Sequence, residues 1–301
     1  MSILISIFIS GYHGKTTDFA KNSSCHRTTI AHFLNSGKWD DSLLSDALKQ
    51  SVIEIIYSEA ARTGKPVFCI VDDTIASKTK PSSQALHPIE DAYFLCDCWY
   101  VSEKIINTFV QKGFHTIGAL KTNRLLYPSG MKKKLSELAA ELSVTHKNFD
   151  LVTVKGRNYY VYRYEGNLNG IENAIVLFSY PEKAFGKPKA LRAFLCMDVS
   201  LSTNEILNNY VCRCPIEVFF RQCKDKLALD SYQIRSAQGI RRYWLIMSFA
   251  HYMCVVGTGE VCPFETGYHK ISDIIQMEKY LTLYQCAREC NDFDSFVKVV
   301  A

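Results

Sequence analysis

The stretch Ala92–Ala119, AYFLCDCWYVSEKIINTFVQKGFHTIGA, indicates the fold class. It begins with a short apolar run, Ala92–Cys96, continues through a helix at Ser102–Lys112 and ends in a second strand, Thr116–Ala119. A strand–helix–strand order is typical of a parallel α/β sheet, since the helix returns the chain to the same edge. Upstream, VFCIV at Val67–Val71 has the continuous apolar character of a strand buried on both faces. We therefore predict an α/β fold.

Carboxylates follow directly after two of these predicted strands. Asp72 and Asp73 come after the first, and Asp97 comes after the second. Because the carboxyl ends of parallel strands share one edge of a sheet, this is where α/β proteins bind ligands. The alternative for the Asp72–Asp73 pair is a helix or turn cap, for which aspartate is common.

A third acidic residue lies in the stretch Tyr210–Lys224, YVCRCPIEVFFRQCK. We expect one helix here, opened by a capping box at Ser202–Glu205. At about 100° per residue, Tyr210, Arg213, Glu217 and Lys224 then share a stripe roughly 60° wide. Burying such a stripe is costly unless it meets metal or phosphate. The alternative is an exposed helix face carrying an Arg213–Glu217 pair.

Composition limits the function classes only loosely. The 301 residues are 48% hydrophobic with a net charge of +5, which is an ordinary globular composition and not decisive for nucleic acid. Between Val101 and Lys134, however, the chain has seven Lys and Arg residues and only one acidic residue. This local excess of positive charge predicts a phosphate-facing patch or a solvated helix face. From that charge alone, Lys121 and Arg124 are candidate contacts to a DNA backbone.

The cysteines and the longest apolar run point to a chain with reduced thiols and no membrane span. Twelve cysteines in a chain of this length, several inside apolar runs, are expected to be small core residues rather than a disulfide framework or a zinc site. The run Tyr243–Gly257 is too short to cross a bilayer and is expected to form a buried core helix.

The pattern along the chain predicts five regions. A helical segment comes first, then strands and helices of a core, a stretch rich in β-type residues, a return to the core, and a helical tail. Their expected bounds are 1–64 (helical, DNA-binding), 65–149 (first part of the core), 150–190 (β-rich insertion), 191–260 (second part of the core, with the glutamate helix) and 261–301 (helical tail).

Three motifs resemble those of the DDE-class insertion-sequence transposases of the IS-four group, which have an RNase H-like catalytic core. The most specific is Tyr210-x-x-Arg213-x-x-x-Glu217-x-x-x-x-x-x-Lys224, which is similar to the family's signature around its catalytic glutamate. Val71-Asp72-Asp73-Thr74 resembles the first aspartate motif, with Asp72 as the favoured match and Asp73 as the alternative. Leu95–Tyr100, LCDCWY, resembles the second, with Asp97 as the match.

The resemblance implies a fold, a chemistry and partners. The fold would be an RNase H-like mixed sheet flanked by helices, with a β-rich insertion. Asp72, Asp97 and Glu217 would hold two Mg²⁺ ions, for which Mn²⁺ could substitute, while Tyr210, Arg213 and Lys224 would contact phosphates. The partners would be double-stranded DNA, as transposon ends and as target, and a second copy of the chain on that DNA. Neither a membrane nor a small-molecule substrate is expected, and the location would be the bacterial cytoplasm, at the nucleoid.

One spacing departs from the family's pattern. Only 24 residues separate Asp72 from Asp97, whereas two further strands and a helix normally lie there and need about 35 residues. We therefore expect a shortened core whose first strand has an unpaired edge, although a parallel crossover can still bring the two aspartates together.

Three functions remain open on these grounds. The leading hypothesis, implied by the resemblance, is a DDE transposase that binds terminal inverted repeats and catalyses Mg²⁺-dependent DNA cleavage and strand transfer. From the shortened core we expect that its motifs survive while transposition does not. The first alternative is a catalytically inactive DNA-binding protein derived from a transposase. The second is an RNase H-like DNA nuclease.

Overall fold

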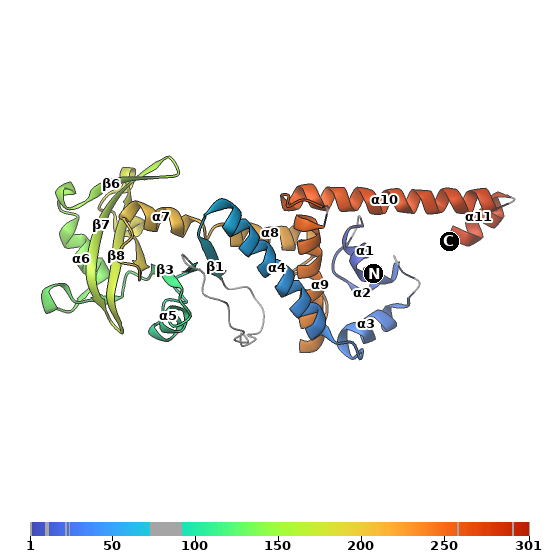
Figure 1. The fold of residues 1–301 in the computed structure, drawn as a ribbon, viewed down its shortest axis with the longest axis horizontal. Coiled ribbons are helices and arrows are strands. Elements are labelled where there is room, and N and C mark those ends of the chain that lie inside the picture. Colours follow the sequence, from blue (N-terminus) through green and yellow to red (C-terminus); the bar gives the residue numbers. More distant parts are fainter. Residues whose placement is uncertain are drawn as a thin grey trace. The chain divides into compact units, whose positions relative to one another are not determined.

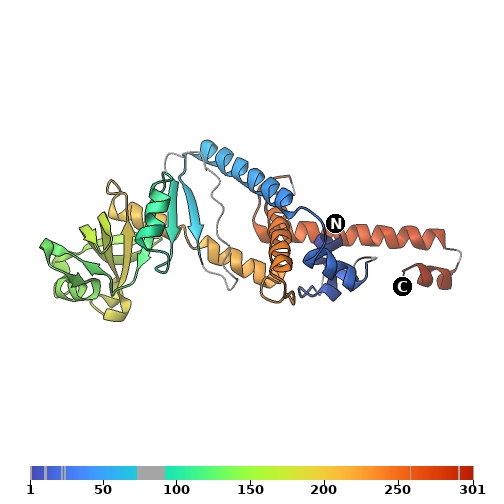
Figure 2. The same ribbon diagram turned by 90° about the horizontal axis from the view of Figure 1, so that it is seen from below.

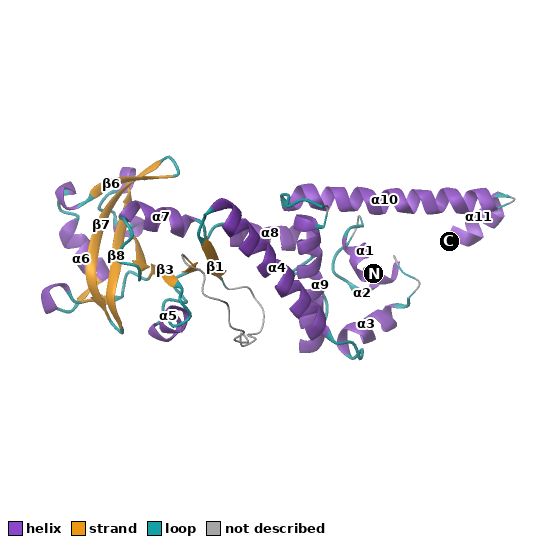
Figure 3. Cartoon of the chain, in the orientation of Figure 1, coloured by secondary structure: helices purple, strands orange, loops and turns teal. Residues whose placement is uncertain are grey.

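The computed structural model of the protein describes residues 2–9, 12–21, 23, 25–72, 92–257, 259–290 and 292–300 (Figure 1). The chain divides into two compact units. One consists of Ile56–Ile216, and the other of Met1–Ile55 together with Glu217–Ala301. All described strands fall in the first unit, and the second is helical (Figure 3). Each unit is described by itself.

The first unit, the sheet unit, is built on one sheet with strand order β1-β2-β3-β9-β8-β7-β4-β5, and β6 pairs with β7. The strands are β1 (Val67–Val71), β2 (Ala92–Cys96), β3 (His115–Leu120), β4 (Leu125–Leu126), β5 (Lys133–Lys134), β6 (Asp150–Val154), β7 (Arg157–Leu168), β8 (Ile171–Pro181) and β9 (Arg192–Cys196). Its helices include α5 (Glu103–Val110), α6 (Leu135–Leu142) and α7 (Thr203–Val211).

The three strands predicted from apolar runs pair as expected for an α/β sheet. β1 is parallel to β2, and β2 is parallel to β3, while β3 and β9 are antiparallel. The bounds of β1 and β2 are those predicted from the sequence. β2 is buried along its whole length, as its continuous apolar run predicts, whereas the prediction that β1 is buried on both faces is wrong. The result is a mixed sheet flanked by helices, compatible with an RNase H-like core.

The β-rich stretch continues the same sheet. β7 and β8 form a long antiparallel hairpin, and β8 pairs with β9, which in turn pairs with β3. The hairpin strands therefore extend the sheet beyond β3 and β9. A shared ladder of backbone hydrogen bonds joins the insertion to the core strands.

Side chains of β2 pack on both faces of the sheet. Phe94 and Cys96 belong to a core that includes side chains of α5 and α6, whereas Tyr93 and Leu95 belong to a second core that includes side chains of α7. Successive side chains of a strand point to opposite faces. β2 is thus held between two apolar layers, and it positions whatever follows its last residue.

β1 occupies the end of the strand order, where β2 is its one partner among the described strands. Its five residues are all half-buried, in contrast to the fully buried β2. The expectation that β1 has an unpaired edge stays a prediction, because the strand pairing is known only for the described residues. The chain between β1 and β2, residues 73–91, lies outside them.

The second unit, the helical unit, packs around α9 (Ala237–Val256), which contains the apolar run predicted to be a core helix. None of the helices in the described ranges is long and apolar enough to cross a membrane. The other helices are α1 (Ser2–Ile7), α2 (Thr16–Lys21), α3 (Arg27–Asn35), α10 (Phe264–Glu289) and α11 (Phe293–Val300), with α4 (Asp41–Thr63) and α8 (Pro215–Leu227) each crossing a boundary between the two units.

A buried arginine on α9 organises the link between α3 and α4. Arg242 is 3% exposed and donates hydrogen bonds to the backbone carbonyls of Phe33, Gly37 and Trp39. Its guanidinium also pairs with Asp41 at 3.3 Å. A buried guanidinium is tolerated because carbonyl and carboxylate oxygens surround it.

We predict that Arg242→Met destabilises the protein by about 3 kcal/mol, because it leaves several buried carbonyls and Asp41 without their donor. The neighbouring, exposed Arg241 provides the matched control, and Arg241→Met is expected to change stability by less than about 0.5 kcal/mol. Urea unfolding followed by circular dichroism measures both. Equal midpoints for the two variants would contradict the structural role of Arg242.

His251 on α9 makes stability depend on pH. Its ring lies 4.7 Å from the rings of Phe219 and of Phe264, and burial lowers its pKa from 6.5 to about 4. The unfolded chain therefore takes up this proton at a higher pH than the folded one. The contribution is fully present above pH 6.5 and is lost as the pH falls towards 4.

We expect the wild type to lose about 2 kcal/mol through this histidine between about pH 7 and about pH 5. His251→Phe keeps an aromatic ring between the two phenylalanines and removes the titrating group. Its stability should therefore fall less over the same interval, as measured by urea unfolding at each pH. The same loss in wild type and variant would show that His251 is not the source.

Candidate active site

Asp72 and Asp97 occupy matching positions at the carboxyl ends of two neighbouring parallel strands, β1 and β2. β1 and β2 are parallel with Val71 opposite Cys96, and each aspartate is the next residue along its strand direction. Neighbouring strands lie about 4.8 Å apart. The sheet therefore brings together the two aspartates that the sequence places at strand ends. Asp73, the alternative to Asp72, lies outside the described residues.

Asp97 is held by the turn that follows β2. Its Oδ1 accepts a hydrogen bond from the backbone N–H of Cys98 at 2.6 Å, and its carbonyl accepts one from the N–H of Tyr100 at 3.0 Å. Burial raises the pKa of the neighbouring Cys96 thiol to about 12, and the Asp97 carboxylate adds to that increase. At neutral pH Cys96 stays a neutral thiol, so the anionic group at this strand end is the carboxylate.

Arg213 forms an ion pair with Asp72. Its Nη2 lies 2.8 Å from Asp72 Oδ2, and the two side chains are only 13% and 18% exposed. Arg213 lies in the turn after α7, so this pair joins that turn to the end of β1. A largely buried, charge-assisted hydrogen bond of this length is stronger than an exposed one.

The expected single helix through Tyr210–Lys224 is wrong. The capping box at Ser202 and Glu205 is present, but it opens α7, which ends at Val211. α8 then begins at Pro215. Proline disfavours a helical conformation in the residue before it and lacks the N–H that a helix interior needs, yet it fits the first position of a new helix. The stripe calculated for one continuous helix therefore does not exist.

Tyr210 lies near the end of α7, against the sheet. Its ring centre is 4.7 Å from that of Phe194 on β9. Burial raises the pKa of Tyr210; the Arg213 guanidinium opposes this shift, and the Asp97 carboxylate adds to it. The phenol therefore stays protonated at neutral pH. It can donate a hydrogen bond but does not act as a base.

Lys121 and Arg124 follow β3, at the same edge of the sheet as the aspartates. The Lys121 ammonium lies 3.4 Å from the ring centre of Trp99, whose residue surface is 70% exposed. Arg124 donates from Nη2 to the backbone carbonyl of Val101 and thereby supports the segment after β2. Lys121 thus places an exposed cation beside the Asp97 turn, while part of the Arg124 guanidinium is engaged within the protein.

Trp99 was not identified from the sequence as a site residue. A large aromatic side chain two positions after Asp97 is the signal that was present. Its exposure depends on the turn geometry, which sequence periodicity does not reveal.

Glu217 and Lys224 both lie on α8 and are both exposed. They are seven residues apart, which places them on one face at about 3.6 residues per turn. On the other side of α8, Phe219 and Cys223 pack into the core of the helical unit. Glu217 thus belongs to the helical unit, whereas Asp72 and Asp97 belong to the sheet unit.

The donor chemistry at the sheet edge suits a hard cation. Asp72 and Asp97 offer carboxylate oxygens, the ligand type that Mg²⁺ prefers. In the part of the chain that the structure describes, no three His, Cys, Asp or Glu side chains form a group that could hold a metal ion. None of the twelve cysteines forms a disulfide.

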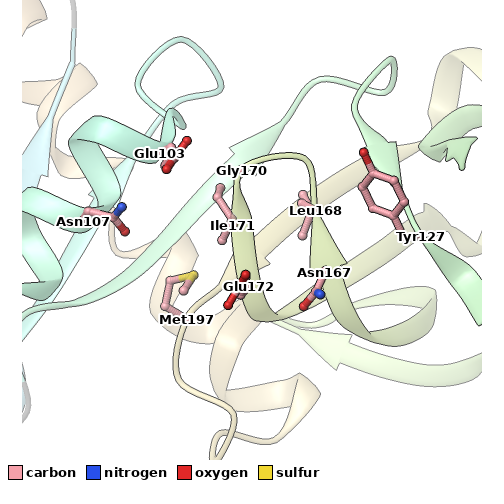
Figure 4. A pocket seen from close by; sticks show the side chains of 9 residues that line it. All are labelled: Glu103, Asn107, Tyr127, Asn167, Leu168, Gly170, Ile171, Glu172 and Met197. Atoms are coloured by element: carbon pink, nitrogen blue, oxygen red, sulfur yellow. The ribbon is translucent and has the colours of Figure 1, made fainter. Parts of the chain in front are cut away.

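A cavity of about 570 Å³ lies elsewhere in the sheet unit (Figure 4). Glu103 and Asn107 of α5 line one side, and the β7–β8 turn with Glu172 lines another. Two carboxylates and no lysine or arginine among its lining residues make this cavity unsuitable for phosphate. The candidate active site is therefore at the carboxyl ends of β1 and β2, which carry Asp72 and Asp97.

Comparison with known families identifies a match over most of the chain. Residues 60–253 match the family described as Transposase DDE domain. A comparison with curated proteins finds no match. The matched region contains the two strand-end aspartates as well as Glu217, and it spans more than half of the 301 residues. The chain belongs to the DDE-type transposases.

Proposed function

We propose that the protein acts on DNA as a transposase of the IS-four group, cleaving at terminal inverted repeats and joining the freed 3′-hydroxyl to target DNA. Membership of the DDE transposase family supports the reaction class. The observation that carries the proposal is the parallel register of β1 and β2, which sets Asp72 beside Asp97. The three motifs support the assignment to the IS-four group.

The proposed metal ligands are Asp72, Asp97 and Glu217. Transposases of this family generally use divalent metal ions, and two Mg²⁺, or Mn²⁺ as a substitute, would activate the attacking oxygen and stabilise the leaving one. Glu217 follows Arg213 by four residues, so the covalent chain keeps their Cα atoms within about 14 Å. Arg213 in turn pairs with Asp72, and this short chain distance supports Glu217 as the third ligand.

The proposed roles of the surrounding groups follow from their charge. While Asp72 holds no metal, Arg213 compensates its negative charge at 2.8 Å. Arginine carries five N–H donors, so its guanidinium can also orient a phosphate when DNA binds. Tyr210, as a neutral phenol, would donate to a phosphate oxygen, and Lys224, Lys121 and Arg124 would lie along the DNA backbone.

The remaining parts of the proposal concern partners and location. Residues 1–64 would contact the terminal repeat, residues 191–260 would complete the catalytic core, and two copies of the chain would act together on the DNA. The location would be the bacterial cytoplasm, at the nucleoid. The overall charge of +5 favours association with a polyanion.

A second candidate is a DNA-binding protein that no longer cleaves. The observation that favours it is the position of β1, which holds Asp72 and has one strand partner in the described sheet. A strand paired on one side is held by fewer backbone hydrogen bonds than a central one. Asp72 would then be positioned less firmly than catalysis on two metals requires.

Cleavage in Mg²⁺ distinguishes the two candidates. The substrate is duplex DNA that carries the inverted repeats flanking the gene. If the protein is active, Glu217→Gln should lower cleavage by about a thousandfold or more while leaving DNA binding intact, because a metal ligand is lost. Asp225→Asn, at another exposed carboxylate of α8, is the matched control and should cleave normally.

Two other outcomes have clear meanings. If the wild type and Glu217→Gln bind the repeats equally and neither cleaves them, the non-catalytic candidate is correct. If cleavage occurs without preference for the repeats, the protein is an RNase H-like nuclease and the transposition proposal fails.

The proposed phosphate contacts predict a change in the salt dependence of DNA binding. Lys121→Ala should weaken binding to all duplexes about equally and reduce the slope of log K against log salt by about 1. Lys147→Ala, at an exposed lysine between α6 and β6, is the control and should leave the slope unchanged. Fluorescence anisotropy at several salt concentrations measures it, and equal slopes for both variants would exclude Lys121 as a contact.

A further inference from the structure

The longest helix of the helical unit exposes an apolar stripe. On α10, five large side chains lie between Ile274 and Tyr284, and each residue is 52–61% exposed. They are Ile274, Met277, Tyr280, Leu281 and Tyr284. Single exposed apolar residues are ordinary on a protein surface, but a contiguous group on one helix marks an interaction site.

The stripe is separate from the face that packs on α9. The buried residues of α10, Phe264, Gly267 and Ile271, all lie in its first third. At Gly267 the backbone of α10 lies close against α9, because a Cβ there would clash with the backbone carbonyl oxygen of Cys254. Towards its C-terminal end the helix continues past α9 towards α11 (Figures 1 and 2). At about 100° per residue, the stripe and the α9 face point in different directions.

The spacing of the stripe is that of a coiled coil. Ile274, Met277, Leu281 and Tyr284 are separated by three, four and three residues, which is the a/d pattern of a heptad. On a helical wheel these four positions fall within an arc of about 80°. Such a narrow seam fits a partner helix rather than a broad protein surface.

The separations of three, four and three residues are the same when the stripe is followed in either direction along the helix. In an antiparallel pair of α10 helices related by a two-fold axis, Ile274 would face Tyr284 of the other copy, and Met277 would face Leu281. Each layer would then combine residues of different shape. A closed two-fold dimer requires such self-complementarity, because residue i must meet residue j and residue j must meet residue i.

The exposed area is sufficient for a dimer. With about half of each side chain exposed, the five residues offer about 100 Å² each, or about 1,000 Å² in total over two copies. Specific interfaces begin near that size. A second copy of this chain is therefore the occupant that both the spacing and the area fit.

We propose that two copies of the protein associate through antiparallel pairing of α10, with Ile274, Met277, Leu281 and Tyr284 in the seam and Tyr280 beside them at the interface. The inference rests on the proposed function in one respect, since it gives a surface to the dimer included there. It is tested on protein without DNA, so its outcome is independent of repeat binding and cleavage.

Light scattering after size-exclusion chromatography, over a range of concentrations, measures the oligomeric state of the nuclease-treated full chain. The wild type should be dimeric, and Leu281→Glu should weaken the dimer by about thirtyfold or more. Thr282→Glu adds the same charge at the next, exposed position and should remain dimeric. Circular dichroism checks that both variants keep their helical content.

A mixture of two variants tests the pairing itself. Leu281→Glu and Met277→Lys should each be monomeric alone. An antiparallel pair places the introduced glutamate of one chain opposite the introduced lysine of the other, so the mixture should form dimers. A parallel pair would not bring these two positions together. Because recovery requires both chains to be folded, it also excludes misfolding as the cause of dissociation.

Several results would overturn the proposal. The first is a wild-type protein that is monomeric at all concentrations. This outcome includes a monomer that binds lipid vesicles through the stripe. The second is a dimer that Leu281→Glu does not weaken, which would place the interface elsewhere. The third is a mixture of the two variants that stays monomeric.

Discussion

The ion pair between Arg213 and Asp72 is the interaction on which the candidate site depends. It joins the turn after α7 to the end of β1 at 2.8 Å, with both side chains largely withdrawn from water. β1 has one strand partner in the described sheet, so this contact supplies a second attachment at the end that carries the aspartate. Removing either charge would leave the other one poorly solvated, which costs more than the loss of an exposed pair.

Arg213, which forms this ion pair, lies in the turn that precedes the helix carrying Glu217. The turn of residues 212–214 lies between α7 and α8, and Pro215 begins the new helix. Glu217 follows in the first turn of α8, where a carboxylate is also favoured by the helix dipole. The motif Tyr210-Arg213-Glu217-Lys224 is therefore distributed over a helix end, a turn and a second helix. Its spacing resembles the signature of a transposase group, although the geometry first inferred from that spacing was wrong.

The two units differ in how much of their structure periodicity predicts. In the sheet unit, β1 and β2 have the predicted bounds because each is an unbroken apolar run, although only β2 has the burial that such a run predicts. The break at Pro215 was missed because the wheel calculation assumed one helix, although proline in a helix interior argues against it. In the helical unit, the core helix α9 was expected, but the buried role of Arg242 was not, since its partners are backbone carbonyls from a distant segment.

The sequence by itself determined the α/β class, the bounds of the two strands that precede the aspartates and the DDE transposase family, because apolar runs, strand-end carboxylates and the spacing of four polar residues are local features. The tertiary structure decided which strands pair and which charges meet. The partner of Arg213 could not be read from spacing, because Asp72 is 141 residues away in the chain. The exposure of the α10 stripe likewise depends on where α9 ends its contact with α10, and a contact between helices is set by packing rather than by the period of either one.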